Sequence, residues 1–167
     1  MADLYVTWDD YHRAIERLAA TIHGSGWRFN QIVCIARGGL RVGDTLSRIF
    51  KLPLAIISTQ SYGEAGRKRG TLTVAKHMTM TTPTLGDRVL LADDLVDSGV
   101  TLDVVRRHLL DTYPAIADIR TAVLWHKACS QCAPDYSVHY LPENPWIHQP
   151  FEPYERMVPA DLLAGQR

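Results

Sequence analysis

The residues from Asp93 to Thr101 have the types and spacing expected of a site for a phosphorylated sugar. Two carboxylates lead the segment, and a third, Asp97, precedes the small residues Ser98 and Gly99 where a helix is expected to begin. Backbone N–H groups at a helix N-terminus bind phosphate. Carboxylates bind ribose hydroxyls instead, directly or through Mg²⁺, which prefers carboxylate and phosphate oxygens. An Asp-rich turn that only caps a helix is the alternative, and the length of this string after an apolar run disfavours it.

Two other groups of polar residues come directly after apolar segments. Arg37-Gly38-Gly39 follows one of them, and its two glycines let backbone N–H groups approach an anion closely. From the residues alone, a simple turn with Arg37 in solvent explains this group equally well. Lys127 follows another apolar segment, and its ammonium group donates hydrogen bonds but accepts none. Both groups are therefore candidates for contacts with anionic or carbonyl groups of a ligand.

The strands that must position these groups are predicted from apolar runs. Runs rich in β-branched residues predict buried strands at Gln31–Ala36, Leu54–Thr59, Arg88–Ala92, Ile119–Trp125 and Tyr136–Leu141. Ser61–Thr71 contains three glycines and shows no periodicity, which predicts a mobile loop. A strand over Leu72–Met78 is expected to return the chain from that loop.

Three helices are predicted from apolar residues at helical spacing. The first begins after a capping box, in which Thr7 is the cap and Asp10 lies three residues further on. The other two are expected over Leu40–Phe50 and Val100–Leu110. Three apolar residues of the second helix are expected to face the core: Leu46, Ile49 and Phe50.

Strands that alternate with helices predict an α/β fold with a mostly parallel sheet covered on both faces. In such sheets ligands bind beyond the carboxyl ends of the strands, where the Arg37 loop, the acidic loop and Lys127 all fall. The 167 residues suggest a single domain over residues 1–167, large enough to bury a core without disulfides or metal.

Composition and charge disfavour several classes of partner. The chain has 18 basic and 18 acidic residues, so no net charge attracts it to nucleic acid or to an anionic membrane. It has no apolar run long enough to span a membrane and no signal-peptide pattern at its N-terminus. The odd count of three cysteines favours a reduced, cytoplasmic protein.

The segment from Val89 to Leu102 resembles the signature of type I phosphoribosyltransferases. The likeness is greatest to the purine-salvage branch, which includes bacterial xanthine–guanine and archaeal-type hypoxanthine/guanine enzymes. It extends over most of the chain, through the motifs Tyr5-Val-Thr-Trp, Ala36-Arg-Gly-Gly-Leu40, Ser61-Tyr62, Trp125-His-Lys127, Pro134-Asp-Tyr136 and Trp146-Ile-His-Gln-Pro150. The acidic segment is specific for the superfamily, and the Trp-Ile-X-Gln-Pro element points to the purine branch.

The resemblance implies both a fold and a reaction. The fold is that of type I phosphoribosyltransferases, with a twisted, mostly parallel sheet flanked by helices as the core (about residues 28–127). The N-terminal segment and residues of about 134–155 would form a small hood, and residues of about 61–72 a flexible lid. The implied substrates are phosphoribosyl pyrophosphate and a purine base, the implied cofactor is Mg²⁺, and the implied assembly is a homodimer or homotetramer.

The resemblance assigns roles in binding the phosphoribosyl group. Asp93 and Asp94 match the pair that holds the ribose hydroxyls and Mg²⁺, and Asp97 matches the residue proposed to take the proton from purine N7. The residues that match the 5′-phosphate cradle are Asp97, Ser98, Gly99, Val100 and Thr101. Val100 stands where relatives often have glycine, and we expect it to adopt an ordinary helical conformation.

The resemblance also assigns a loop and a lid to pyrophosphate. The pyrophosphate loop, which often carries a cis peptide bond in the family, corresponds to Arg37, Gly38 and Gly39. The lid begins at Ser61 and Tyr62. Any of its three basic residues could meet pyrophosphate: Arg67, Lys68 or Arg69. A solvated basic loop is the alternative for this run.

The purine is expected to contact residues near the end of the chain. Lys127 matches a lysine that donates to the 6-oxo group, which favours a 6-oxopurine over adenine, and Trp146 matches an aromatic residue that stacks on the base. An exposed anchor or interface residue is the alternative for Trp146. Ile147 matches a backbone contact to the 2-position edge, where His148 could favour xanthine, but the choice among hypoxanthine, guanine and xanthine stays open. Glu143 is a candidate for a second Mg²⁺ contact.

Three other interpretations of the sequence are less well supported. A zinc site could use two cysteines and two histidines, His126, Cys129, Cys132 and His139, but only one Cys-X-X-Cys step is present and both histidines are expected in strands. A non-catalytic sensor of phosphoribosyl pyrophosphate that binds nucleic acid is disfavoured by the zero net charge and by the presence of the base-binding residues. A dinucleotide oxidoreductase is disfavoured because no Gly-X-Gly-X-X-Gly turn follows the first predicted strand.

Overall fold

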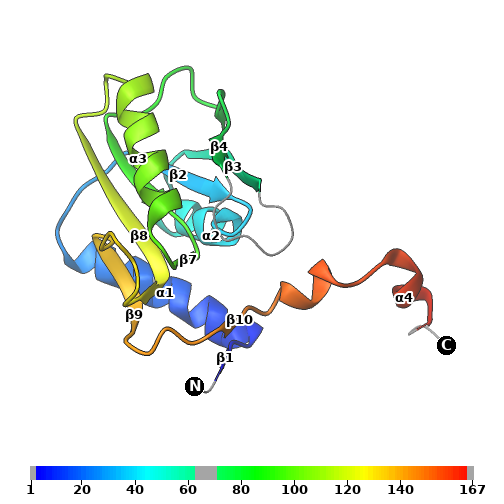
Figure 1. Cartoon of the computed structure of the whole chain (residues 1–167). Coiled ribbons are helices and arrows are strands. Elements are labelled where there is room, and N and C mark those ends of the chain that lie inside the picture. The colour runs from blue at the N-terminus through cyan, green and yellow to red at the C-terminus, as the bar shows by residue number, and fades with distance from the viewer. Residues whose placement is uncertain (1–2, 63–70, 165–167) are drawn as a thin grey trace.

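The computed structural model describes residues 3–62 and 71–164, and it contains a large sheet, a small sheet and flanking helices (Figure 1). The strands of the large sheet are β2 (Gln31–Ala36), β3 (Leu54–Tyr62), β4 (Thr71–Val74), β5 (Thr79–Met80), β6 (Arg88–Ala92), β7 (Leu95–Val96), β8 (Asp118–Lys127) and β9 (Tyr136–Leu141). Their order is β4-β3-β2-β6-β8-β7, with β5 also paired to β3 and β9 also paired to β8. Only β4 and β5 run antiparallel to their neighbour within the described residues, so the predicted mostly parallel sheet is confirmed.

The strand prediction was wrong at the antiparallel edge. β3 continues to Tyr62, beyond the predicted end at Thr59, because it gains β4 as a partner. The strand expected over Leu72–Met78 is divided between β4 and the two-residue β5, since the chain bends at Lys76 and His77 between them.

The helices are α1 (Trp8–Gly24), α2 (Leu40–Phe50), α3 (Val100–Thr112) and the short α4 (Pro159–Ala164), with a 3₁₀ turn, η1, at Glu152–Glu155. The capping box at Thr7 is confirmed, because its hydroxyl accepts from the N–H of Asp10 and the Asp10 carboxylate accepts from the N–H of Thr7. The inward orientation expected for Ile49 was wrong, since this side chain is 47% exposed. The buried stripe of α2 is centred on Val42, Gly43 and Leu46, which leaves Ile49 at its margin.

The core consists of two apolar clusters, one on each face of the sheet. On β2, Ile32 packs with α1 and α2, whereas Val33 and Ile35 pack with α3. The same alternation on β6 directs Leu90 to the first cluster and Leu91 to the second. Helices on both faces hold the parallel strands in place and leave their carboxyl ends uncovered for a site.

Two segments that are distant in the sequence meet in the small sheet, which pairs β1 (Leu4–Tyr5) in parallel with β10 (Ile147–His148). Beyond β10 the chain passes along the body and then projects away from it with η1 and α4 (Figure 1). Each strand of this ribbon has only two residues, too short for a periodic pattern in the sequence. In the part of the chain that the structure describes, no helix has the length and apolar character needed to cross a membrane.

Candidate active site

The three candidate groups meet at one edge of the large sheet. β2, β6 and β8 are adjacent and parallel, with Cys34 opposite Ala92 and Ala92 opposite Ala122. Their carboxyl ends therefore place the Arg37 loop, the acidic loop and Lys127 side by side, as the sequence predicts.

Asp93 and Asp94 lie at the centre of this edge, directly after β6. The Oδ1 atom of Asp93 accepts from the N–H of Asp94 at 2.9 Å, and Oδ1 of Asp94 accepts from the N–H of Leu95 at 2.8 Å. Burial raises the pKa of both carboxyls, and the charge of Asp94 raises the pKa of Asp93 further. Two neighbouring carboxylates in a desolvated position favour a proton, a hydroxyl donor or a cation beside them.

The Arg37-Gly38-Gly39 loop packs directly against the acidic pair. A Cβ atom on Gly38 would lie 2.6 Å from Oδ1 of Asp94, and one on Gly39 would lie 2.6 Å from the carbonyl oxygen of Ala92. The peptide bond between Ala36 and Arg37 is cis. Glycine is thus required at position 38 for the close approach to the Asp94 carboxylate and at position 39 for the close approach to the backbone of β2 and β6.

The second half of the acidic loop opens α3 and surrounds a cavity of about 150 Å³. Gly99 adopts a left-handed conformation with φ 84°, and no side chain at that position caps the helix. Val100 is the first helical residue, so the expected ordinary conformation is confirmed and the left-handed position falls on Gly99 instead. The first N–H groups of α3 consequently face this cavity as a candidate anion site.

Lys127 connects the acidic loop to the expected purine position. Its side chain is buried, its Nζ lies 3.6 Å from Oδ1 of the exposed Asp97, and the same Nζ lies 5.9 Å from the centre of the Trp146 ring. Trp146 is 60% exposed, so one of its faces is available to a ligand. A donor-only ammonium, a carboxylate and an aromatic face are therefore within one small region.

The backbone of Ile147 is presented on the side away from β1. The carbonyls of Trp146 and His148 accept from the N–H groups of Leu4 and Val6, at 2.8 and 3.0 Å. Because carbonyls alternate along an extended strand, the carbonyl of Ile147 between them points to the opposite edge. The contact of Ile147 with a base edge stays a prediction.

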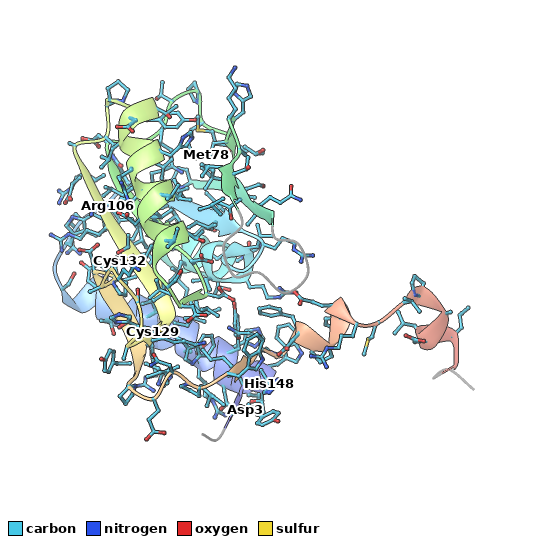
Figure 2. The ribbon with its side chains drawn as sticks, viewed as in Figure 1. Asp3, Met78, Arg106, Cys129, Cys132 and His148 are labelled. Atoms are coloured by element: carbon cyan, nitrogen blue, oxygen red, sulfur yellow. The ribbon has the colours of Figure 1, made fainter. Side chains whose placement is uncertain are left out.

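His148 contacts two carboxylates of the protein, and the residue also lines a cavity of about 540 Å³ beside β10. Its Nε2 lies 3.0 Å from Oδ2 of Asp3 and its Nδ1 lies 3.2 Å from Oε2 of Glu152, and Figure 2 shows His148 and Asp3 side by side. The ring also stacks on Tyr5, with 4.4 Å between centroids. The hydrogen bond to Asp3 is the main reason that the pKa of His148 is raised. The ring therefore ties β1 to β10.

Sequence reasoning missed the residues that close the site on the side of the Arg37 loop. A cavity of about 500 Å³ is lined by Arg37, Gly38, Leu40, Arg41, Asp94, Phe151, Tyr154 and Glu155. Arg41 lies over the rings of Phe151 and Trp8, at 4.7 and 5.3 Å from their centroids, and Gln149 donates to Oδ2 of Asp94 at 3.4 Å. Gln149 belongs to the Trp-Ile-X-Gln-Pro element, so that motif held a signal for it.

Several expected residues are not placed in the site. Arg67, Lys68 and Arg69 lie outside the described residues, and only the backbone of Ser61 and Tyr62 is described, as the end of β3. Glu143 is exposed in the turn after β9, where the neighbouring Asn144 accepts a hydrogen bond from the N–H of Cys129.

The zinc interpretation gains no support from the side chains. Across residues 3–62 and 71–164, no three His, Cys, Asp or Glu side chains are arranged to hold a metal ion. Both histidines lie in strands, as expected, with His126 opposite Tyr140 and His139 opposite Trp125.

Comparisons with known proteins agree on one family. The sequence profile of the phosphoribosyl transferase domain matches residues 7–156. Xanthine-guanine phosphoribosyltransferase of Gluconobacter oxydans is 33% identical over 92% of this chain and 87% of its own length, and that of Idiomarina loihiensis is 27% identical over 98% and 94%. The crystal structure of purine phosphoribosyltransferase from Pyrococcus horikoshii superposes with a TM-score of 0.74 at 29% identity, covering 91% of this chain and 95% of that one.

Proposed function

This chain belongs to the phosphoribosyl transferase family, and on that premise we propose that it transfers the 5-phosphoribosyl group from phosphoribosyl pyrophosphate to a 6-oxopurine. The products are the nucleoside monophosphate and pyrophosphate. The observation that carries the proposal is the position of Lys127, whose buried ammonium lies 3.6 Å from the Asp97 carboxylate and 5.9 Å from the centre of the Trp146 ring. This one group joins the phosphoribosyl loop to an exposed aromatic face.

The acidic loop and the Arg37 loop fit phosphoribosyl pyrophosphate. The uncapped start of α3 suits the 5′-phosphate, the Asp93 and Asp94 carboxylates suit the ribose hydroxyls, and the backbone at Gly38 suits pyrophosphate. All three contacts come from adjacent ends of parallel strands, so one extended substrate can reach them together.

The purine is proposed to bind between Lys127 and Trp146. The Lys127 ammonium can only donate, so it pairs with the carbonyl of a 6-oxopurine and not with the amino group of adenine. The xanthine-guanine names of the two sequence relatives make xanthine and guanine the first bases to test. His148 is hydrogen-bonded to Asp3 and Glu152, and its role in choosing xanthine stays a prediction.

Asp97 is proposed to act as the base in the transfer. The bond between ribose C1 and the pyrophosphate oxygen breaks, and its electron pair leaves with pyrophosphate. A bond forms between C1 and a purine nitrogen, and the proton that the purine gives up passes from N7 to the Asp97 carboxylate. Asp97 is exposed and beside Lys127, so it can reach a purine that Lys127 holds by its 6-oxo group.

Magnesium is the cofactor that the family implies, and the acidic pair fits it. Asp93 and Asp94 supply the carboxylate oxygens that Mg²⁺ prefers, in a position where burial opposes two uncompensated negative charges. Neither carboxylate is within ion-pair distance of a basic side chain among the described residues. When bound, the ion supplies positive charge beside the leaving pyrophosphate. Glu143 as a second contact, the homo-oligomeric state and the cytoplasmic location stay predictions.

A spectrophotometric screen tests the proposed function. The purified protein is incubated with phosphoribosyl pyrophosphate, Mg²⁺ and hypoxanthine, guanine, xanthine or adenine in turn, and nucleotide formation is measured. We expect turnover of at least one 6-oxopurine and none of adenine. Omission of Mg²⁺ tests the cofactor and should abolish this turnover. Absence of nucleotide from every 6-oxopurine would contradict the transferase and favour the non-catalytic sensor.

A further inference from the structure

The loop between β8 and β9 carries the Cys-X-X-Cys step, and it binds the back of the acidic loop. The carbonyls of three consecutive residues lie within hydrogen-bond distance of this loop, and the single S–H of Cys129 is shared between the carbonyl and the carboxylate of Asp97. Sγ of Cys129 lies 3.6 Å from the carbonyl oxygen of Asp97. The N–H of Gln131 donates to the carbonyl oxygen of Ser98 at 2.9 Å. Sγ of Cys132 lies 3.3 Å from the carbonyl oxygen of Gly99. Figure 2 shows both cysteines close to the N-terminal end of α3.

Fixing these carbonyls also fixes the N–H groups on the other side of the same peptides. In a planar trans peptide the C=O and N–H bonds point in opposite directions. With the carbonyls of Asp97, Ser98 and Gly99 turned toward the cysteine loop, the N–H groups of the three following residues turn away from it. Those N–H groups belong to the candidate phosphate cradle, where the N–H of Val100 also makes a long hydrogen bond, at 3.4 Å, to Oγ of Ser98.

We propose that Cys129 and Cys132 are positioning residues, whose thiols hold the peptides of the phosphate cradle in the orientation that binds the 5′-phosphate. This inference rests on the proposed function, since it takes the ligand of the cradle to be the phosphate of phosphoribosyl pyrophosphate. It gives the Cys-X-X-Cys step a role in substrate binding that needs neither zinc nor a disulfide.

The packing between the two loops is too close for an incidental contact. A Cβ atom on Gly99 would lie 2.6 Å from Oγ of Ser130 and 2.7 Å from Sγ of Cys132. Sγ of Cys129 also lies 3.3 Å from Oδ1 of Asp97, and partial desolvation followed by this hydrogen bond raises the pKa of the thiol. The raised pKa favours the protonated thiol, which is the form that can donate.

The loop also contacts the turn that leads to the purine-binding element. The N–H of Cys129 donates to Oδ1 of Asn144 at 2.8 Å, two residues before Trp146. The cysteine loop therefore touches the cradle through Cys132 and the approach to the base through Cys129, so that a change at Cys132 is expected to affect the cradle alone.

Substitution of Cys132 tests the proposal, with affinity for phosphoribosyl pyrophosphate measured by calorimetry so that no turnover is needed. Cys132→Ala removes one weak donor and should weaken this affinity about 3- to 10-fold. Cys132→Ser retains a hydroxyl donor and should recover part of the loss. The Kd for the purine and the Tm should stay near those of the parent chain.

Cys34→Ala is the matched control, because Cys34 is buried in β2 and its thiol contacts no residue of the cradle. This variant should lose some thermal stability without weaker binding of phosphoribosyl pyrophosphate. Unchanged affinity in Cys132→Ala would overturn the proposal, as would a loss that serine does not reduce or that falls equally on both substrates. If the parent chain binds phosphoribosyl pyrophosphate but transfers nothing, the proposed function fails while this test still applies.

Discussion

The two halves of the candidate site are assembled differently. The phosphoribosyl half is almost continuous in the chain, since Asp93 to Thr101 runs from the end of β6 into α3, and a neighbouring parallel strand adds the Arg37 loop. The purine half combines Lys127 at the end of β8 with Trp146 and Ile147 from a ribbon whose other strand begins at Leu4.

This difference indicates which half can vary. The phosphoribosyl half is fixed by the central sheet and by close backbone packing, because Gly38 and Gly39 leave no room for a side chain. The purine half depends on a two-residue ribbon and an exposed tryptophan. We therefore expect substitutions in the first half to abolish the reaction and substitutions in the second to change affinity for the base.

The largest expected effect comes from Asp97→Asn. Asparagine keeps the size of the side chain but cannot accept the purine proton, so kcat should fall about 10²- to 10⁴-fold. The affinity for phosphoribosyl pyrophosphate should change little, because the backbone N–H groups of the cradle are retained. Steady-state rates and calorimetry measure the two quantities separately. An unchanged kcat would show that Asp97 only positions the substrate.

Trp146→Ala should have an intermediate effect, confined to the purine half. Loss of stacking on one base should raise the KM for the purine about 10- to 100-fold, and Trp146→Phe should raise it less. The KM for phosphoribosyl pyrophosphate should stay near that of the parent chain. Tyr140→Ala is the matched control, because Tyr140 is equally exposed, at 60%, and lies on β9. Equal effects of the two alanine variants would contradict stacking on Trp146.

The same contrast explains what the sequence could predict. The strands Gln31–Ala36, Arg88–Ala92 and Tyr136–Leu141 and the helix Leu40–Phe50 coincide with their predicted bounds. In these segments the apolar pattern reflects burial against the central sheet. Because the candidate groups directly follow such strands, their convergence was predictable from the parallel topology alone.

The parts that could not be predicted depend on contacts between distant residues. The pairing of Leu4 with Ile147 joins two segments that are distant in the sequence, through strands too short to show a period. The contact of Cys132 with Gly99 was missed because it needs the left-handed conformation of that glycine, which the sequence does not display. The sequence around Arg41 is typical of any polar residue on a helix surface, and it does not show that the distant Phe151 packs against the guanidinium group.

The smallest expected effect concerns Asp94, where the two halves meet through the hydrogen bond from Gln149. Burial raises the pKa of the Asp94 carboxyl in the folded protein above its value near 4 in the unfolded chain. At pH values between these two pKa values, the native state binds more protons than the unfolded state. The free energy of unfolding of the ligand-free protein should therefore fall as the pH rises through that window, and the stabilising effect of the proton should be fully present only below it.

Asp94→Asn removes this titration and the repulsion on Asp93. The ligand-free variant should be more stable than the parent chain at pH 7 by on the order of 1 kcal/mol, or roughly 2–4 °C in Tm, and its stability should vary less between pH 4 and 7. The proposed contact of Asp94 with the ribose and Mg²⁺ predicts a separate and larger loss of transferase activity, which is measured apart from this small change in stability. Thermal unfolding at a series of pH values measures the effect. A variant less stable than the parent chain at pH 7 would mean that the hydrogen bonds from Leu95 and Gln149 outweigh the desolvation of the carboxylate, and that the acidic pair is held for the fold as much as for the substrate.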